Sequence, residues 1–336
     1  MVVVAEMNSG NRRFVVATHG HCFDGLCSAV VFSHLARELS GAADFEYVAC
    51  GYGPGQNGVD PAKLVGIDNA ILDYRFSASD KLTWYFDHHV SAFPTDGERT
   101  AYAASAGETP RRFFHDGAYS SCTKLIADIA ASSFGLDFSR FDELVRWADI
   151  IDSARFPSAE MAVARAEPAL QLMTVVEHQG DDAFLTRMVP RLSHASLEEV
   201  ATAKDIQLAY QPLRDQNSRF VDLVKANASE RGPVVLVDLL HEKIDVATKF
   251  VTYALYPDRA YSVVLTRARD KAKISVEYNP WCKAPRTHDI AQICEKYGGG
   301  GHPVVGAVSL KPDDTGAVRS IAAEIVAALE APAAGR

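Results

Sequence analysis

Three polar clusters, each placed directly after a strand-like run, constrain this chain more than any other feature of its sequence. Asp87-His88-His89 follows residues 83–86, residues 19–25 follow residues 14–18, and Asp73 follows residues 70–72. The preceding runs are apolar, aromatic or β-branched, which is typical of buried strands. The carboxyl ends of parallel strands meet at one edge of an open α/β sheet, where ligands bind. The sequence therefore predicts that the three clusters converge.

The side chains in these clusters are suited to bind metal ions. Histidine and carboxylate together form a mixed ligand set that matches Mn, Fe, Co or Zn. Asp73 alone would be interpreted as a solvated strand end, but its place between two histidine-containing clusters favours a role as a ligand. The residues by themselves thus predict a metal site.

The first half of the chain alternates strand and helix patterns, which predicts an α/β fold with a mostly parallel sheet. Apolar residues at helical spacing predict a helix over residues 26–39, and alternation predicts a strand over residues 45–50. The further predictions for this half are a short helix near residues 78–82, a surface excursion over 92–118, and helices over 121–134 and 139–152.

The pattern of the second half predicts a helical connector followed by a smaller mixed α/β domain. A helical stretch begins at Ser196 with acidic residues in its first turn and reaches about Ala228, with Pro212 as a candidate interruption. The predicted elements after it are strands over residues 233–238, 261–267, 272–279 and 303–310, and helices over 244–256, 289–297 and 316–330. We therefore predict a first, metal-binding domain at 1–195, a connector at 196–230 and a second, smaller domain at 231–330.

The amino-acid composition and net charge limit the kinds of ligand that the chain can bind. The 336 residues carry a formal net charge of −9, which argues against wrapping long duplex DNA, because that needs a broad basic face. A short phosphate ligand is compatible with this charge, since bound divalent cations supply local positive charge. The six cysteines are scattered, and neither a signal peptide nor a long apolar run is recognised. These features predict a cytoplasmic protein without a membrane span.

A glycine-rich segment in the second half is another candidate site, and it consists of Gly298, Gly299, Gly300, Gly301 and His302. Glycine backbone can approach a ligand closely, and its amides can bind an anion. Arg267 and Arg269 add positive charge on the neighbouring predicted strands, and Tyr278 and Trp281 could stack a base. The segment therefore predicts binding of a substrate phosphate, with a flexible hinge as the alternative interpretation.

Taken together, these motifs resemble the DHH phosphoesterase superfamily, which is named for its Asp-His-His motif. The likeness rests on Asp87-His88-His89, the upstream His19 and Asp24-Gly25, the intervening Asp73 and the distant glycine-histidine segment. It covers most of the chain: the first half is similar to the catalytic domain and the last third to the DHH-associated domain. The resemblance implies hydrolysis of phosphoesters or phosphoanhydrides with two divalent metals, most often Mn, with Mg, Co, Fe and Zn as alternatives.

The same resemblance implies roles for individual residues. The implied metal ligands are His19, Asp24, Asp73, His88 and Asp149, with Asp73 bridging the two metals and Asp152 competing with Asp149. The implied catalytic residues are His89 and Asp87. His89 would donate a hydrogen bond to the phosphoryl oxygen or a proton to the leaving oxygen, and Asp87 would orient His88.

The first motif departs from the family pattern. Members commonly carry two aspartates there, separated by one residue, whereas this chain has only Asp24. Cys22 holds the other position and His21 precedes it, so both compete as ligands. The departure leaves open which metal is bound and whether both positions are filled.

The function favoured by these features is hydrolysis of phosphodiester bonds in short oligonucleotides or linear or cyclic dinucleotides, by a water that two metals activate. Two alternatives stay open: a hydrolase for polyphosphate or pyrophosphate, and a non-catalytic sensor that binds nucleotides. The expected partner is a short phosphate-containing substrate, with no long duplex DNA and no membrane. A homodimer is compatible with the sequence.

Overall fold

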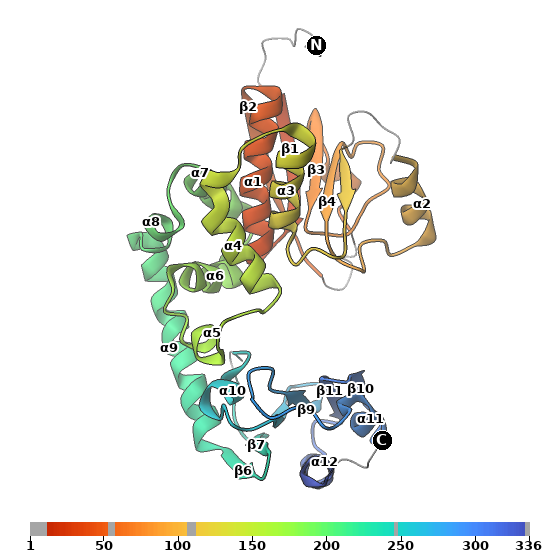
Figure 1. Ribbon diagram of the computed structural model, residues 1–336, viewed down its shortest axis with the longest axis vertical. Helices are drawn as coiled ribbons and strands as arrows, with labels where there is room; N and C mark the ends of the chain where they lie inside the picture. Colours follow the sequence, from red (N-terminus) through yellow and green to blue (C-terminus); the bar gives the residue numbers. More distant parts are fainter. Residues whose placement is uncertain (1–11, 53–57, 106–111, 245–247, 333–336) are drawn as a thin grey trace. The chain divides into compact units, whose positions relative to one another are not determined.

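The computed structural model describes residues 12–52, 58–105, 112–244 and 248–332 (Figure 1). The chain divides into two compact units. Unit 1 comprises Met1–Arg155 and Glu167–Tyr210, and unit 2 comprises Phe156–Ala166 and Gln211–Arg336. Each unit has its own sheet.

Unit 1 is built on a five-stranded sheet in the order β2-β1-β3-β4-β5, and every pair is parallel. The strands are β1 (Arg12–His19), β2 (Ala43–Cys50), β3 (Asp68–Leu72), β4 (Trp84–Asp87) and β5 (Phe113–His115). The chain passes from β1 to β2 on one side and then to β3 on the other side of β1. The strand order therefore reverses between β1 and β3, and ligands bind at such a reversal in open α/β sheets.

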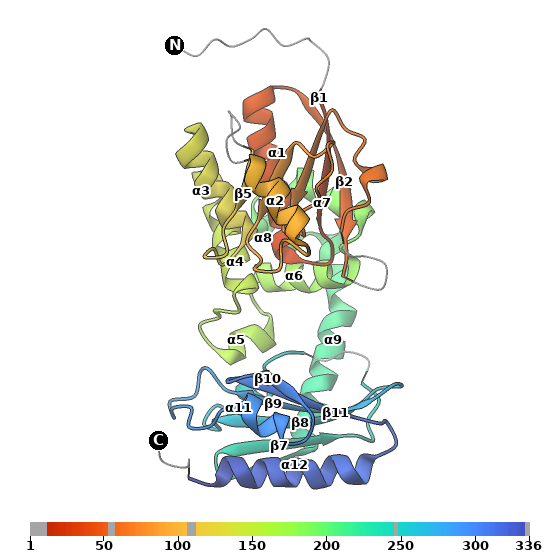
Figure 2. The ribbon, with the colours of Figure 1, turned by 90° about the vertical axis from the view of Figure 1, so that its right-hand side faces the viewer.

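Both faces of this sheet are covered, which explains the apolar, buried centres of its inner strands (Figure 2). Phe32 of α1 packs against Phe14 and Phe86 on one face. On the other face, Tyr85 packs against Tyr102 of α2. The helices of this part of the unit are α1 (Phe23–Ser40), α2 (Asp96–Ala104), α3 (Cys122–Phe134) and α4 (Asp142–Asp152).

Helices also fill the middle of the chain. They are α5 (Ala159–Ala164), α6 (Pro168–Gln179), α7 (Asp182–His194), α8 (Leu197–Ala201) and α9 (Lys204–Ala226). The capping box of Ser196 and Glu199 starts α8, as the acidic first turn predicts. Within the described ranges, no helix combines the length and the apolar character needed to cross a membrane.

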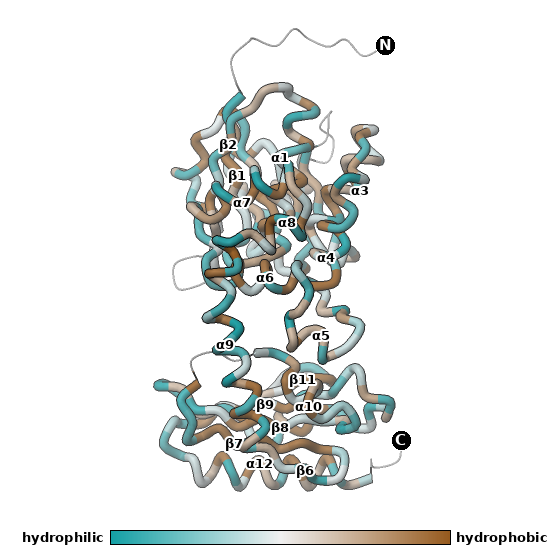
Figure 3. The backbone as a smooth tube through the Cα atoms, turned by 90° about the vertical axis from the view of Figure 1, so that its left-hand side faces the viewer, coloured by the Kyte–Doolittle hydropathy of each residue, from teal (hydrophilic) through white to brown (hydrophobic). Residues whose placement is uncertain are grey.

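Unit 2 has a six-stranded mixed sheet in the order β10-β11-β9-β8-β7-β6, in which only β7 and β8 pair in parallel. Helix α12 (Thr315–Glu330) lies along one face, as Figure 2 shows, and the apolar strand segments visible in Figure 3 form the core beneath it. The other elements are β6 (Ala228–Arg231), β7 (Val234–Leu239), α10 (Val251–Leu255), β8 (Tyr261–Arg267), β9 (Ala272–Tyr278), α11 (Ile290–Glu295), β10 (Gly300–His302) and β11 (Val305–Leu310).

The predicted fold class, a mostly parallel α/β unit followed by a mixed α/β unit, is confirmed. Two local predictions are wrong, and a third region is more regular than predicted. Residues 78–82 form turns instead of a helix, whereas the surface excursion predicted over 92–118 contains α2, which has no buried residue, and the edge strand β5. The helix predicted over 244–256 is reduced to α10, and residues 245–247 lie outside the described residues.

The helical connector differs in detail from the prediction. The stretch breaks at residues 202–203, between α8 and α9, whereas Pro212 lies inside α9 without ending it. Residues 156–166 pack with unit 2, although the predicted first domain ran without a gap to residue 195. As functional domains, the boundaries 1–195, 196–230 and 231–330 remain a proposal.

Candidate metal centre

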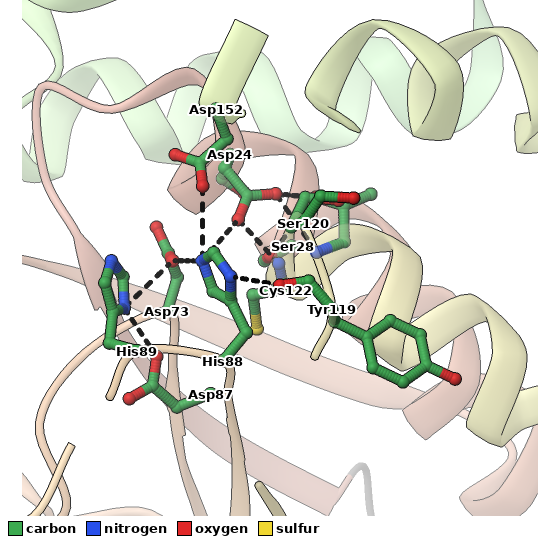
Figure 4. A network of polar contacts seen from close by, with 12 residues as sticks. Asp24, Ser28, Asp73, Asp87, His88, His89, Tyr119, Ser120, Cys122 and Asp152 are labelled. Atoms are coloured by element: carbon green, nitrogen blue, oxygen red, sulfur yellow. Dashed lines mark hydrogen bonds and ion pairs between the residues drawn. The ribbon is translucent and has the colours of Figure 1, made fainter. Parts of the chain in front are cut away.

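Asp73 lies between His88 and His89 in a polar cluster at the carboxyl edge of the unit 1 sheet (Figure 4). It directly follows β3 and is 0% exposed. Asp73 Oδ2 lies 3.7 Å from His19 Nδ1, and Asp73 Oδ1 lies 3.5 Å from His88 Nε2 and 3.8 Å from His89 Nδ1. The three clusters that follow β1, β3 and β4 therefore meet around one carboxylate.

A second group of side chains surrounds His88. Its Nε2 lies 3.2 Å from Asp152 Oδ2 and 3.8 Å from Asp24 Oδ2, while its Nδ1 lies 3.0 Å from the carbonyl oxygen of Tyr119. A carbonyl can only accept, so Nδ1 donates the proton of this hydrogen bond. In the neutral ring, Nε2 is then an unprotonated acceptor that faces carboxylates. A metal ion is the partner that such a nitrogen and such carboxylates can share.

Asp24 is fixed by the start of α3. Its Oδ2 accepts a hydrogen bond from the Cys122 amide at 2.7 Å. Its Oδ1 accepts from the Thr123 amide at 3.0 Å and from Thr123 Oγ1 at 2.6 Å. A helix N-terminus stabilises negative charge, so these contacts hold a carboxylate in place at the edge of the sheet.

The donor atoms of the cluster are of the kind that can hold a divalent cation. Among the described residues, Asp73 Oδ1 and His88 Nε2 are buried without a hydrogen-bond partner, which is rare unless an ion or water completes the site. Three sets of ligand atoms lie within 4.8 Å of one another: His19, Cys22 and Asp73; Asp73, His88 and His89; Asp24, His88 and Asp152. Asp73 and His88 are each shared by two sets, so a bridging position for Asp73 fits this geometry.

The pKa values in the cluster reflect its excess of carboxylates. Burial raises the pKa of Asp24, and the carboxylates of Asp73 and Asp152 raise it further. Burial lowers the pKa of His88, but Asp152 and Asp73 outweigh burial and raise this pKa to about 11. Burial and the carboxylate of Asp73 also raise the pKa of the Cys22 thiol. The site favours positive charge, which bound divalent cations would supply.

Asp87 contacts His89 and not His88, so the prediction that it orients His88 is wrong. Asp87 Oδ1 lies 2.8 Å from His89 Nδ1, and Asp87 Oδ2 accepts a hydrogen bond from the Tyr85 hydroxyl at 3.1 Å. Consecutive side chains of an extended segment point to opposite sides, which brings Asp87 and His89 together and leaves His88 to the Tyr119 carbonyl. The hydrogen bond with Asp87 raises the pKa of His89. A raised pKa keeps the ring protonated, which a residue that donates a proton needs.

Replacing His89 by alanine is expected to lower kcat by about 10²- to 10⁴-fold, the range for loss of a general acid. KM should change much less, because a proton donor acts mainly in the transition state. Steady-state kinetics on a phosphodiester substrate measure both effects. A rise in KM at unchanged kcat would make His89 a substrate anchor and end its assignment as the acid.

Asp152, rather than Asp149, reaches the cluster. Asp149 Oδ1 accepts hydrogen bonds from Ser120 Oγ at 2.6 Å and from Ser121 Oγ at 3.3 Å. Ser121 is also the N-cap of α3, so the hydrogen bonds to Asp149 stabilise the start of that helix. Asp152, the last residue of α4, has its carboxylate beside His88. We therefore revise the ligand expected from α4 from Asp149 to Asp152.

Cys22, rather than His21, lies beside Asp73. Cys22 Sγ is 3.6 Å from Asp73 Oδ2. His21 is exposed, has a φ of +55°, and its amide donates to the Gly180 carbonyl at 3.0 Å. Its side chain is in none of the three ligand sets found among the described residues.

The sequence did not single out Tyr52, which lies next to His19. The two ring centroids are 5.0 Å apart, and the Arg75 guanidinium lies 5.0 Å from the Tyr52 centroid. Tyr52 is 46% exposed. It lies two residues past the end of β2, and an aromatic residue just past a strand end at the binding edge was the signal that could have marked it.

The glycine segment of unit 2 is only partly available to a ligand. The Gly298 and Gly299 amides donate to the carbonyls of Glu295 and Cys294, so the prediction that the glycine amides bind an anion is wrong for these two. A Cβ on Gly299 would lie 2.2 Å from the Ala307 carbonyl oxygen, so close packing against β11 requires glycine there. Around Gly300, by contrast, no atom would lie within 4 Å of a Cβ.

The remaining side chains proposed for unit 2 divide into exposed and engaged residues. His302, Arg267 and Arg269 are exposed. Trp281 Nε1 donates to the Phe156 carbonyl at 2.9 Å, and the Tyr278 hydroxyl donates to the Ala284 carbonyl at 3.1 Å. Both aromatic residues are thus held within unit 2.

The chain shares its fold with a solved phosphodiesterase structure. The pGpG-specific phosphodiesterase PggH from Vibrio cholerae is similar to it with a TM-score of 0.66 and 19% identity, over 94% of this chain and 99% of that chain. An exopolyphosphatase-related protein from Bacteroides fragilis has a TM-score of 0.46 and 13% identity, over 96% of this chain and 94% of that chain. RecJ from Thermus thermophilus in complex with Mn²⁺ has a TM-score of 0.46 and 14% identity, over 96% of this chain and 53% of that chain. No family model and no curated protein matches the sequence.

Proposed function

We propose that this protein is a metal-dependent phosphodiesterase that hydrolyses short nucleotides, with linear 5′-phosphorylated dinucleotides as its preferred substrate class. The observation that carries the proposal is the buried carboxylate of Asp73, which is shared between two sets of ligand atoms. Carboxylates in such positions hold pairs of divalent ions in enzymes that displace phosphoryl leaving groups. The fold shared with a pGpG-specific phosphodiesterase supports this choice of substrate class.

Each residue of the cluster has a separate task in the proposed reaction. The proposed ligands are His19, Cys22, Asp24, Asp73, His88 and Asp152. Divalent metals, with Mn expected first, would polarise the phosphoryl group and acidify a water molecule. His89, held through Nδ1 by Asp87, would present its Nε2 to the leaving oxygen and protonate it. Asp87 would stabilise the charged ring before the transfer.

A nucleotide is favoured over polyphosphate or pyrophosphate by Tyr52. A half-exposed aromatic ring beside a proposed metal ligand can stack a base, whereas a phosphate chain offers it no partner. Arg75, which lies over the same ring, adds positive charge for a nucleotide phosphate. The sensor alternative is disfavoured, because binding alone does not need a paired acid and base such as Asp87 and His89 beside the ligands.

Replacing Tyr52 by alanine is expected to raise KM for a dinucleotide about tenfold, since stacking of one base is worth about 1–3 kcal/mol. Tyr52→Phe is the matched control: it keeps the ring and should leave KM nearly unchanged. Kinetics with a dinucleotide and metal analysis of both variants provide the measurement. Equal KM values for the alanine variant and the unmodified protein would remove the base-stacking role.

Unit 2 is proposed to bind the distal phosphate of the substrate. The groups that would do so are the backbone around Gly300 and the side chains of His302, Arg267 and Arg269. In this proposal, residues 1–195 supply catalysis and residues 231–330 supply substrate binding. We expect the protein to act in the cytoplasm, where its free cysteines stay reduced, and a homodimer is compatible with the proposal.

A substrate panel tests the proposed function. The full chain, supplied with Mn²⁺, is incubated with a 5′-phosphorylated linear dinucleotide, a cyclic dinucleotide, a ten-nucleotide single strand, polyphosphate and pyrophosphate. Nucleotide chromatography and phosphate release should show the linear dinucleotide cleaved most efficiently, by kcat/KM. Preferential release of phosphate from polyphosphate or pyrophosphate would replace the proposal with a phosphoanhydride hydrolase. Turnover of none of them would favour a sensor.

A further inference from the structure

We propose that Cys22 is a thiolate ligand, so that the two metal positions are chemically unequal. One position would be formed by His19, Cys22 and Asp73, with one nitrogen, one sulfur and one oxygen donor. The other would be formed by Asp24, His88 and Asp152, with one nitrogen and two oxygen donors, and Asp73 would lie between them. The inference rests on the metal centre of the proposed function and adds to it the identity of the metals.

The position of Cys22 supports this role. Cys22 is the N-cap of α1, but its side chain makes no capping hydrogen bond. Cys22 Sγ instead lies 3.6 Å from Asp73 Oδ2. The same oxygen atom lies 3.7 Å from His19 Nδ1. The three donor atoms thus surround one point at the edge of the sheet.

The oxygen atoms around this thiol also indicate a bound cation. Asp73 is fully buried, and its other oxygen, Oδ1, has no hydrogen-bond partner among the described residues. Metal binding would release the thiol proton to solvent, and the thiolate and carboxylate would both turn to the cation.

The neighbouring cysteines are engaged differently. Cys122 Sγ donates to the Phe86 carbonyl at 3.3 Å, and Cys50 Sγ lies 3.8 Å from the Val48 carbonyl. Neither is part of a ligand set among the described residues, although Cys50 pairs with His19 in the β1–β2 register. Proximity to the metal centre therefore does not by itself place a cysteine among the ligands, and Cys50 is a suitable control.

Unequal donors imply unequal metal preference. Thiolate and imidazole favour Zn, Fe or Co, whereas carboxylates favour Mn or Mg. The position with Cys22 should therefore hold a softer ion than the position with Asp24 and Asp152. A mixed pair, with Mn in only one position, is the expected resting composition.

The thiolate can be detected directly with cobalt. The full chain is stripped of metal with a chelator and titrated with Co²⁺, while the near-ultraviolet absorption of a sulfur-to-cobalt charge transfer and the number of bound ions are recorded. The unmodified protein and Cys50→Ser should show the band. Cys22→Ser and Cys22→Asp should lose it, and Cys22→Asp should keep two ions per chain.

Competition between metals supplies a second readout. Zn²⁺ and Mn²⁺ are offered together, and bound metal is analysed. Cys22→Asp should shift the preference towards Mn²⁺ by at least about tenfold, the lower end of the range for a disturbed metal site. Thermal unfolding shows whether each variant is folded, and the unmodified protein tests the inference even if a variant is not.

The outcomes separate this inference from the proposed function. Two Co²⁺ ions bound by the unmodified protein without the band, or a band that persists in Cys22→Ser, would overturn the assignment of Cys22. Dinucleotide hydrolysis in that case would leave the proposed function standing. A band lost with Cys22, in a protein that cleaves no dinucleotide, would support the ligand and reject the function.

Discussion

Asp73→Asn is expected to reduce phosphodiester hydrolysis by about a thousandfold or more, because a shared ligand of two metals contributes several kcal/mol of transition-state stabilisation. Asparagine is preferred to alanine for this test. Asp73 has a φ of +52°, a region that asparagine tolerates and alanine does not. Bound metal should fall together with activity.

The metal-free stability of Asp73→Asn provides the control. The substitution removes a carboxylate that raises the pKa of Asp24 but also raises the pKa of His88, so the thermal unfolding of both stripped proteins is measured first as the reference. Added Mn²⁺ should raise Tm of the unmodified protein much more than that of the variant. Turnover close to that of the unmodified protein would refute Asp73 as the central ligand.

Asp152→Asn is expected to remove one metal ion per chain and to lower kcat/KM by about a hundredfold or more, since even outer contacts of metal sites are worth about 10- to 100-fold. Asp149→Asn is the matched control, because it makes the same change three residues earlier on α4. It should keep both metals and lower the free energy of unfolding by about 1–2 kcal/mol, through weaker hydrogen bonds from Ser120 and Ser121.

Metal analysis and denaturant unfolding of the two α4 variants distinguish their roles. If Asp149→Asn loses metal while Asp152→Asn retains it, the assignment made from the structure is reversed. The original sequence prediction of Asp149 would then be restored. Loss of metal from both variants would mean that the metal site also needs the stabilisation of the start of α3 by Asp149.

The sequence was sufficient to predict which strand ends meet. A polar residue directly after an apolar run marks the carboxyl end of a buried strand, and parallel pairing brings such ends together. His19, Asp73 and His88 follow from this rule alone. The order of the strands, which places the reversal between β1 and β3, is set by packing and is not encoded in any local motif.

Side-chain partners were harder to predict than positions. Asp149 and Asp152 are both on α4, and the choice between them depends on how that helix lies against α3. The partner of Asp87 depends on the extended backbone after β4, which directs it to His89. The choice on α4 is a property of tertiary geometry that leaves no signal in residue spacing. The pairing of Asp87 with His89 follows instead from the alternation of an extended backbone, which the sequence prediction did not use.

The roles of the individual glycines in the segment 298–301 were also ambiguous in the sequence. Gly299 is required because the Ala307 carbonyl lies where its Cβ would be, whereas Gly300 has open space around it. Four consecutive glycines give no sign of which one serves packing and which could face a ligand. Tyr52 was missed because no periodicity marks it, and its place just past a predicted strand end was the one signal in the sequence.

Metal-dependent cleavage of a dinucleotide by the stripped and reconstituted protein tests the central claim most directly. The full chain is freed of metal, divided, and assayed by chromatography for release of mononucleotides from a 5′-phosphorylated dinucleotide, with and without added Mn²⁺. We predict no turnover without metal, restored turnover with Mn²⁺, and no restoration in Asp73→Asn. Equal cleavage with and without metal, or full restoration in the variant, would contradict a metal-dependent phosphodiesterase centred on Asp73.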